Sequence, residues 1–273
     1  MLPDELKQRE IAIKSIILAA GKTALEYFNN RVAGSFTLKG KQDFLTEADA
    51  LVEQQIKTAI HEQFPDDELF GEETGGSIKK PSVWVIDPID GTANFARDIP
   101  HFCISIAFVH EGMTELGAIY NPVTDELYQT RKGFGTTKNG CMLHVSAIND
   151  LNQASIEFGW STRISSQDYL DAYQAILNSG ANIRRSGSGA LALAWVAEGR
   201  TDGYAELHMN AWDCLAGLLM VQEAGGCIGL FPRTHQEITQ GGPVIAAAPG
   251  IASIFSQATK LTLASSKSFE EVL

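Results

Sequence analysis

Residues 87–95 are the part of the chain whose types and spacing are best suited to chemistry, and they read DPIDGTANF. Asp87 and Asp90 directly follow the apolar run VWVI of residues 83–86, which predicts a buried strand. Gly91 and Thr92 then form a turn. Carboxylates at a strand end, beside a turn that presents backbone N–H groups, suit a hard cation bridged to an anion. The stretch therefore predicts a phosphate held against Mg²⁺.

Three further carboxylates could complete such a site. Glu72 and Glu73 follow a short predicted strand, and Asp213 follows Trp212 at the start of a predicted helix. Taken singly, each acid has an ordinary alternative as a helix cap or as part of a solvated turn. A buried group of like charges, however, would be costly without cations. Because the ligands would be oxygens and no HExxH motif is present, Mg²⁺ or Mn²⁺ is favoured over zinc.

Composition limits the possible partners. The chain has 273 residues, 44% of them hydrophobic, which suits one large domain or two closely joined lobes. Its formal charge of −12 disfavours nucleic acid and anionic membrane as partners. The four cysteines (Cys103, Cys141, Cys214 and Cys227) form no CxxC pair, so neither a disulfide nor a zinc site is expected. Without a secretory leader or a membrane-length apolar run, a cytoplasmic protein is predicted.

The elements that must position these residues alternate along the chain. In the first half, apolar spacing predicts helices over residues 4–29 and 46–63, and strands over 68–71, 83–86, 103–109, 116–120, 126–131 and 135–138. In the second half it predicts strands over 155–160, around 183, 203–207 and 244–248, and helices over 166–177, 190–197, 212–224 and 251–262. We infer a layered α/β unit with no linker, in which residues from about 1–145 form a metal-binding lobe with an antiparallel sheet and about 146–273 a substrate lobe with a mixed sheet.

Three segments together resemble the inositol monophosphatase family. They are GEE at 71–73, WVIDPIDGTANF at 84–95, and the run from WD at 212–213 to EAGG at 223–226, in matching order and spacing. Residues 41–49 also resemble the family, and RRSGS at 184–188 is most similar to the bacterial extragenic-suppressor type of inositol-1-phosphatase. The resemblance covers nearly the whole chain. It implies an alternating α-β-α-β-α sandwich of the sugar-phosphatase type.

The resemblance also implies roles in metal binding for the matched acids. Glu72, Asp87 and the backbone carbonyl of Ile89 would hold a first Mg²⁺. Asp87, Asp90 and Asp213 would hold a second. A weaker third ion near Glu72 is implied as well, so that two to three Mg²⁺ ions are expected, with Mn²⁺ as a possible replacement.

Water activation and phosphate binding are implied at the same motif. Thr92, paired with Asp49, would orient the attacking water together with Glu72. The backbone N–H groups of Gly91 and Thr92, at the start of a helix, would receive the phosphate.

The substrate's leaving group would meet the second half of the chain. Gly187, Ser188 and Gly189 would line it, beside Asp213. Glu206 would accept hydrogen bonds from its hydroxyls. The alternative for Glu206 is an ordinary surface charge on an edge strand.

The function predicted from these observations is a Mg²⁺-dependent phosphomonoesterase acting on inositol-1-phosphate or a similar small polyol or sugar phosphate. A water nucleophile is predicted because neither the Cys-x5-Arg nor the aspartyl-phosphate signature is present. Histidinol phosphate, fructose-1,6-bisphosphate and 3′-phosphoadenosine 5′-phosphate are alternative substrates, and a mainly regulatory binding protein is an alternative class. The resemblance further implies inhibition by Li⁺ and a homodimer.

Overall fold

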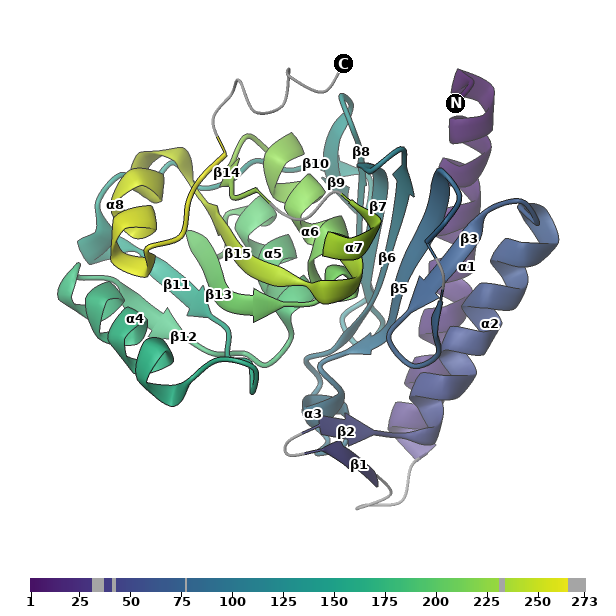
Figure 1. The fold of residues 1–273 in the computed structure, drawn as a ribbon, viewed down its shortest axis with the longest axis horizontal. Coiled ribbons are helices and arrows are strands. Elements are labelled where there is room, and N and C mark those ends of the chain that lie inside the picture. Colours follow the sequence, from purple (N-terminus) through teal and green to yellow (C-terminus); the bar gives the residue numbers. More distant parts are fainter. Residues whose placement is uncertain (31–36, 41–42, 77, 231–233, 265–273) are drawn as a thin grey trace.

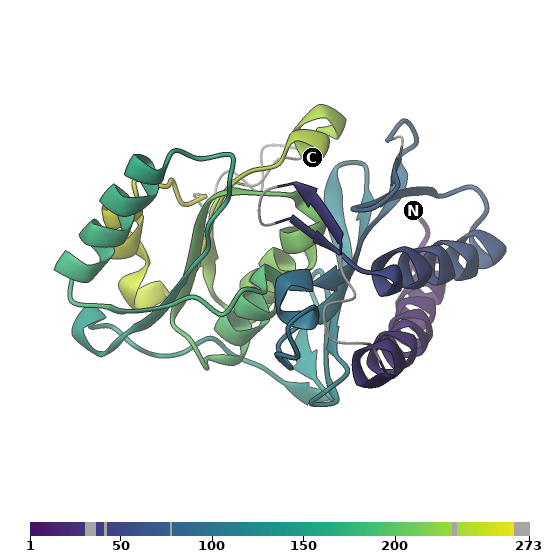
Figure 2. The same ribbon diagram turned by 90° about the horizontal axis from the view of Figure 1, so that it is seen from below.

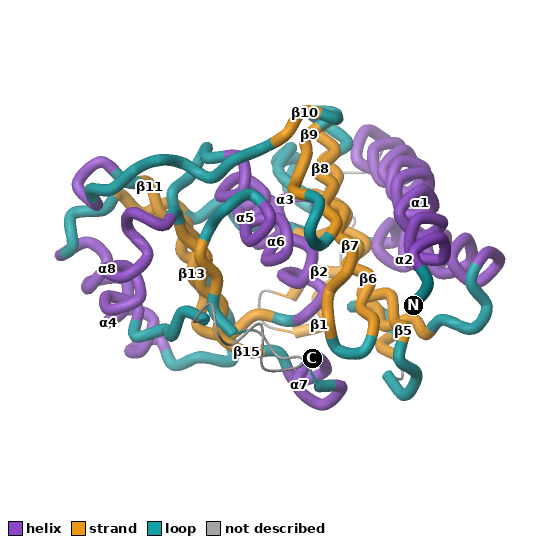
Figure 3. Tube along the Cα trace, turned by 90° about the horizontal axis from the view of Figure 1, so that it is seen from above, coloured by secondary structure: helices purple, strands orange, loops and turns teal. Residues whose placement is uncertain are grey.

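The computed structural model describes residues 1–30, 37–40, 43–76, 78–230 and 234–264. Helices and sheets alternate in five layers, which the views from the side and from above both show (Figures 1 and 3). One outer layer consists of α1 (Pro3–Asn30) and α2 (Glu47–Gln63), and the central layer consists of α5 (Gly189–Glu198) and α6 (Ala211–Glu223). The opposite outer layer consists of α4 (Ser166–Asn178) and α8 (Pro249–Thr259). The predicted α-β-α-β-α sandwich is confirmed.

The larger sheet lies between the α1–α2 layer and the central helices, and its strand order is β10-β9-β8-β7-β6-β5-β3-β4. Its strands are β3 (Glu68–Gly71), β4 (Gly75–Gly76), β5 (Ser82–Asp90), β6 (Cys103–His110), β7 (Met113–Asn121), β8 (Glu126–Arg131), β9 (Gly135–Lys138) and β10 (Cys141–Met142). Neighbouring strands are antiparallel except for β3 and β5, which are parallel. The carboxyl ends of β3 and β5 therefore meet at one edge of the sheet.

The smaller sheet is mixed and has the order β12-β11-β13-β15-β14. Its strands are β11 (Ser155–Phe158), β12 (Asn182–Arg184), β13 (Gly203–Met209), β14 (Cys227–Ile228) and β15 (Gly242–Ala247). Strand β11 runs parallel to β12 and β13, whereas β15 is antiparallel to β13 and β14. Strand β13 is thus the central strand of this sheet.

The central helices α5 and α6 join the two halves of the chain. Both are apolar on almost every side, as expected for helices enclosed between two sheets. One hydrophobic cluster accordingly contains Val85 of β5, Leu193 of α5, Met220 of α6 and Ala246 of β15. The strands of the two sheets fall on either side of residue 145, and the lobe boundary predicted there stays a prediction.

Several short elements have no counterpart in the sequence analysis because they are too short to show a period. They are the hairpin of β1 (Thr37–Gly40) and β2 (Asp43–Leu45), β4, β10, the 3₁₀ turn Leu151–Gln153, β14 and α7 (His235–Gln240). The helix start that the resemblance implied at Gly91 and Thr92 is present as the short helix α3 (Thr92–Phe95). The β1–β2 hairpin lies at the same end of the molecule as α3 (Figures 1 and 2). Lys41, part of the family-like segment, lies outside the described residues. None of the described helices has both the length and the apolar character needed to cross a bilayer.

Candidate active site

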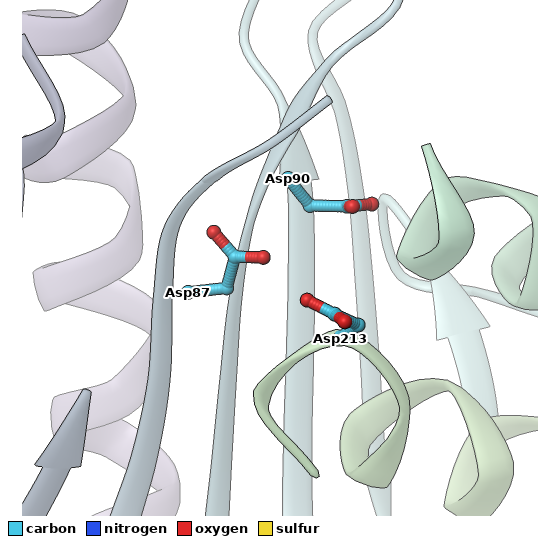
Figure 4. Close-up of side chains that lie close together, drawn as sticks. All are labelled: Asp87, Asp90 and Asp213. Carbon is cyan, nitrogen blue, oxygen red and sulfur yellow. The ribbon is translucent and has the colours of Figure 1, made fainter. Parts of the chain in front are cut away.

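The carboxylates of Asp87, Asp90 and Asp213 converge at one point, with one oxygen of each within 4.8 Å of the other two (Figure 4). Strand β5 does not end at Ile86 as predicted but continues to Asp90. Its pairing with β6 shifts between Asp87 and Asp90, which is a bulge that contains Pro88. Residues three apart in a regular strand face opposite sides, so the bulge is what brings both carboxylates to the same side.

Asp213 reaches the cluster from the first turn of α6. Its Oδ2 accepts a hydrogen bond from the backbone N–H of the N-cap residue, Asn210, at 3.3 Å. The Ser105 hydroxyl on β6 donates to the Trp212 carbonyl at 3.2 Å and ties this helix start to the sheet. Asp213 therefore helps to cap its helix and faces Asp87 and Asp90 at the same time.

The cluster concentrates negative charge in a buried place. Asp87 is 1% exposed and Asp90 is 8% exposed. Burial raises the pKa of Asp87 well above its usual range, and the charges of Glu72, Asp90 and Asp213 raise this pKa further. Burial and the charge of Asp90 likewise raise the pKa of Asp213 to about 7. Such a group is stable as anions only beside cations.

The chemistry of the donor set indicates which cation fits. Within the described part of the chain, the converging group consists of carboxylates alone. Hard divalent ions such as Mg²⁺ and Mn²⁺ prefer oxygen ligands, whereas zinc sites usually include His or Cys. The three residues therefore fit Mg²⁺ or Mn²⁺.

Glu72 lies beside this cluster, directly after β3. Gly71 pairs with Ile86 of the parallel strand β5, and the Glu72 N–H donates to the Ile86 carbonyl at 3.1 Å. The Glu72 charge acts on Asp87, as the pKa of Asp87 shows. Parallel pairing of β3 and β5 is thus the reason that Glu72 and Asp87, distant in the sequence, come together.

Thr92 and Asp49 are also brought together. The Asp49 Oδ2 accepts the N–H and the hydroxyl of Thr46 at 2.8 and 2.5 Å, which fixes it in the first turn of α2. The Thr92 hydroxyl oxygen lies 3.3 Å from Asp49 Oδ1 and 2.9 Å from the Ile89 carbonyl oxygen. The Ile89 N–H in turn donates to Asp87 Oδ1 at 2.9 Å.

Helix N-termini surround the acidic cluster. The start of α5 meets Asp90, whose carboxylate accepts hydrogen bonds from the Ser188 hydroxyl and from the N–H groups of Gly189 and Ala190, the last at 2.7 Å. Helices α2 and α6 also begin here, with Asp49 and Asp213 in their first turns. Because the N-terminus of a helix carries partial positive charge, these ends offset part of the repulsion among the acids.

A cavity of about 170 Å³ opens beside the cluster. Five of the predicted substrate-binding residues line it, namely Gly187, Ser188, Gly189, Glu206 and Asp213, whereas Gly91 and Thr92 do not. Glu206 lies on the central strand β13, so the edge-strand alternative is wrong. Burial raises the pKa of Glu206 to about 8, against the lowering effect of a hydrogen bond from the Tyr204 hydroxyl at 2.5 Å.

Sequence reasoning missed three side chains that hold this site. The Asn94 amide donates to the Ser186 carbonyl at 2.9 Å, and Glu157 accepts the Ser186 N–H at 3.0 Å. Both peptide groups of Ser186 are therefore fixed, at the start of the loop that continues through Gly187 and Ser188. Glu53 is fully buried behind Glu72. An acid within an apolar helical stripe or an apolar strand was the available signal for Glu53 and Glu157; Asn94 gave none beyond its place in the motif.

The chain belongs to the inositol monophosphatase family, whose model matches residues 5–263. This confirms the resemblance seen in the sequence. It supports a phosphatase that acts on phosphomonoesters.

Individual relatives agree with this assignment. The chain is 38% identical to the Nus factor SuhB of Pasteurella multocida, over 85% of this chain and 88% of that protein, and 35% identical to the Nus factor SuhB of Escherichia coli K12, over 82% and 86%. Among solved structures it is similar to the extragenic suppressor protein suhB of Bartonella henselae, with a TM-score of 0.84, 31% identity, and coverage of 91% of this chain and 97% of that one. The inositol monophosphatase of Anabaena (Nostoc) sp. gives a TM-score of 0.81 and 29% identity over 94% and 98% of the chains.

Proposed function

We propose that this protein is a Mg²⁺-dependent phosphomonoesterase that hydrolyses inositol-1-phosphate or a similar small polyol or sugar phosphate. The observation that carries the proposal is the convergence of the Asp87, Asp90 and Asp213 carboxylates within 4.8 Å. Together with Glu72 and the Ile89 carbonyl, these residues would hold two to three ions. Bound divalent ions supply charge stabilisation for the phosphate oxygens and lower the pKa of a water molecule.

The chain's own groups would place the water and the phosphate. The Thr92 hydroxyl, whose proton is directed at the Ile89 carbonyl or Asp49, would accept a hydrogen bond from a water beside Glu72. Gly91 has φ of 94° and is the N-cap residue of α3, and the backbone N–H groups of Gly91 and Thr92 would receive the phosphate. A water nucleophile needs only such positioning and charge, and no side chain has to form a covalent intermediate.

The leaving group would occupy the neighbouring cavity. Gly187 and Gly189 line this cavity, and Ser188 is held by Asp90. With its pKa raised to about 8, Glu206 is largely protonated near pH 7 and would both accept hydrogen bonds from substrate hydroxyls and donate one to them, which favours a polyol. The amide and carbonyl of Ser186 are already bonded to Glu157 and Asn94, so the loop is preorganised.

The first experiment measures phosphate release from inositol-1-phosphate with and without Mg²⁺, for the wild type and for Asp90→Asn and Asp213→Asn. Each variant removes a charge from the cluster with little change of shape, so we expect a loss of activity of at least about 10²-fold. Full activity in both variants would refute the metal assignment. Replacement of Mg²⁺ by Mn²⁺, and addition of Li⁺, test the ion preference and the expected inhibition.

The second experiment compares four substrates at equal concentration: inositol-1-phosphate, histidinol phosphate, fructose-1,6-bisphosphate and 3′-phosphoadenosine 5′-phosphate. We expect the highest kcat/KM for the inositol ester. A clear preference for histidinol phosphate would keep the proposed chemistry and replace the proposed substrate.

We also propose a cytoplasmic homodimer. The proposal rests on the family, and light scattering at micromolar concentration tests it. A monomer under those conditions contradicts it.

A regulatory binding role is the second candidate function, because relatives at 35–38% identity are named Nus factors. The formal charge of −12 argues that nucleic acid would not be the direct contact of this chain, so a protein partner is favoured. A pull-down with wild type and Asp213→Asn separates the two functions. Phosphatase rates near background together with a retained partner would favour the regulatory role, whereas Mg²⁺-dependent turnover without a partner would favour the enzyme.

A further inference from the structure

Glu53 is a buried carboxylate that the proposed reaction does not use. It lies on α2, one turn after Asp49, and its side chain is completely buried. Lys57, the next residue along the same face, lies 2.8 Å from Glu53 Oε1. A buried carboxylate destabilises the fold unless each of its oxygens accepts hydrogen bonds, so the partners of Glu53 indicate its role.

The bonds of Glu53 go to the peptide groups that follow Glu72. Glu53 Oε2 accepts the N–H of Glu73 at 2.9 Å. Its Oε1 accepts the N–H of Thr74 at 3.0 Å and the Thr74 hydroxyl at 2.6 Å. Both oxygens are therefore committed to the turn that begins at Glu72.

The residue before Glu72 is shaped for the same contact. A Cβ at Gly71 would lie 2.5 Å from Glu53 Oε2, closer than a Cβ atom, which forms no hydrogen bond, comes to an oxygen. Only glycine therefore lets the carboxylate approach the strand end this closely. Glu72 is thus held between two neighbours, Gly71 and Glu73, that both contact Glu53.

Lys57 completes the arrangement from the outer side. Its ammonium group pairs with Glu53, contacts the Thr74 hydroxyl and lies 3.4 Å from the Gly75 carbonyl. The turn after β3 is consequently bonded to one face of α2, the helix that also supplies Asp49 to the site.

We propose that Glu53 is a positioning residue that fixes Glu72 beside Asp87 and so sets the affinity of the site for a divalent cation. The inference rests on the proposed role of Glu72 in metal binding. Residues that orient metal ligands typically change metal affinity or activity by about 10- to 100-fold when replaced. A role limited to stability would leave the affinity of the folded protein for Mg²⁺ unchanged.

The test is Glu53→Gln, which keeps the shape of the side chain and removes its charge. Calorimetric titration with Mg²⁺ measures the affinity directly, and the Mg²⁺ dependence of inositol-1-phosphate hydrolysis measures it again through turnover. We expect Mg²⁺ binding weakened by about 10-fold or more, with the KM for the ester at saturating Mg²⁺ changed by less than about twofold. Unchanged Mg²⁺ affinity in the folded variant overturns the proposal.

Glu198→Gln is the matched control. Glu198 is also a mostly buried carboxylate that pairs with a lysine, Lys138, and accepts a hydroxyl, that of Tyr128 at 2.7 Å. It lies at the C-terminal end of α5, whereas the cluster lies at the N-terminal end of that helix. We expect this variant to lose stability and to keep the wild-type affinity for Mg²⁺. An equal loss of affinity in Glu198→Gln would attribute the effect to general loosening and overturn the proposal.

Thr74→Val covers the case in which Glu53→Gln does not fold. Thr74 is exposed, and valine removes one of the bonds to Glu53 at nearly constant shape. A smaller but measurable weakening of Mg²⁺ binding supports the proposal, and wild-type affinity contradicts it. If the wild type binds Mg²⁺ but hydrolyses none of the esters, the proposed function fails while the titrations still decide the role of Glu53.

Discussion

Two buried carboxylates near Glu72, those of Glu53 and Asp87, have pKa values that are shifted in opposite directions. Burial raises the pKa of Glu53, but the hydrogen bonds from Lys57, Thr74 and the Glu73 N–H outweigh burial and leave its pKa below the usual range. The pKa of Asp87 is instead raised well above its range by burial and by three neighbouring acids. Burial of an acid therefore does not by itself indicate a cation site. The neighbours of the acid decide.

The comparison separates two physical roles. The protein itself supplies the partners of Glu53, which makes this region complete without a ligand. The Asp87 region gathers like charges at helix N-termini, and within the described part of the chain the largest influences on the pKa of Asp87 are burial and three acids, Glu72, Asp90 and Asp213. A divalent cation is the partner that would balance it.

The largest expected effect comes from neutralising each acid in turn. In EDTA, Asp87→Asn should raise the free energy of unfolding by about 1–3 kcal/mol because it relieves repulsion, and Glu53→Gln should lower it by about 3–5 kcal/mol because it breaks a buried ion pair. Asp87→Asn should also reduce phosphate release by at least about 10²-fold. Urea denaturation measures the two stabilities. Changes of the same sign would break the comparison.

Mg²⁺ should stabilise the folded protein against heat. A ligand present at 100 times its Kd adds about 2.7 kcal/mol when it binds only the folded state. We expect the Tm of the wild type to rise with Mg²⁺ concentration and the Tm of Asp90→Asn to rise much less. Scanning calorimetry over a Mg²⁺ series measures both, and an equal rise in the two proteins would place the ion elsewhere.

Without metal, the stability of the folded protein should fall as the pH rises, because the pKa values of the clustered acids are raised in the folded state. Without metal, Asp213 has a pKa of about 7 when folded against an ordinary value of 3.8, so the folded state keeps a proton that the unfolded state has released. Its contribution is therefore complete below about pH 4 and is lost as the pH rises through about 7. In EDTA, the Tm of the wild type should fall relative to Asp213→Asn as the pH rises from about 5 to 8. A Tm difference between the two proteins that does not change with pH contradicts this prediction.

The smallest effect is expected at Gly189. An added Cβ would lie 2.3 Å from the terminal methyl of Met209, which is flexible and can move aside. We expect Gly189→Ala to change the KM for inositol-1-phosphate by less than about threefold and the affinity for Mg²⁺ hardly at all. Steady-state kinetics and titration test this. A large loss of Mg²⁺ affinity would show that the cavity and the cluster cannot be treated as separate regions.

Long periodic elements of the fold could be predicted from the sequence. The helices α1 and α2 and the strands β6 to β9 lie where apolar spacing places them. The end of β5 could not be predicted, because Pro88 and the pair of acids read as the close of the strand although a bulge carries it on to Asp90. Helix α7 is too short and polar to produce a recognisable period.

The candidate site divides in the same way. The converging acids were found because each lies at one end of an apolar element, and the family resemblance supplied their roles. Glu53 was missed because a Glu four residues before a Lys is typical of a solvated helix face. The overlooked signal is that Asp49 and Glu53 fall within the buried stripe of Val52 and Ile56.

Asp90 connects the acidic cluster with the neighbouring cavity, since its carboxylate accepts hydrogen bonds from Ser188, Gly189 and Ala190 at the start of α5, where the loop that lines the cavity ends. A cation coordinated by the Asp90 oxygens and a substrate bound at this loop would therefore both affect the Asp90 side chain. By thermodynamic reciprocity, whatever factor the ion contributes to substrate affinity, the substrate must return to ion affinity. Substrate binding and ion binding would therefore be thermodynamically coupled through the side chain of Asp90.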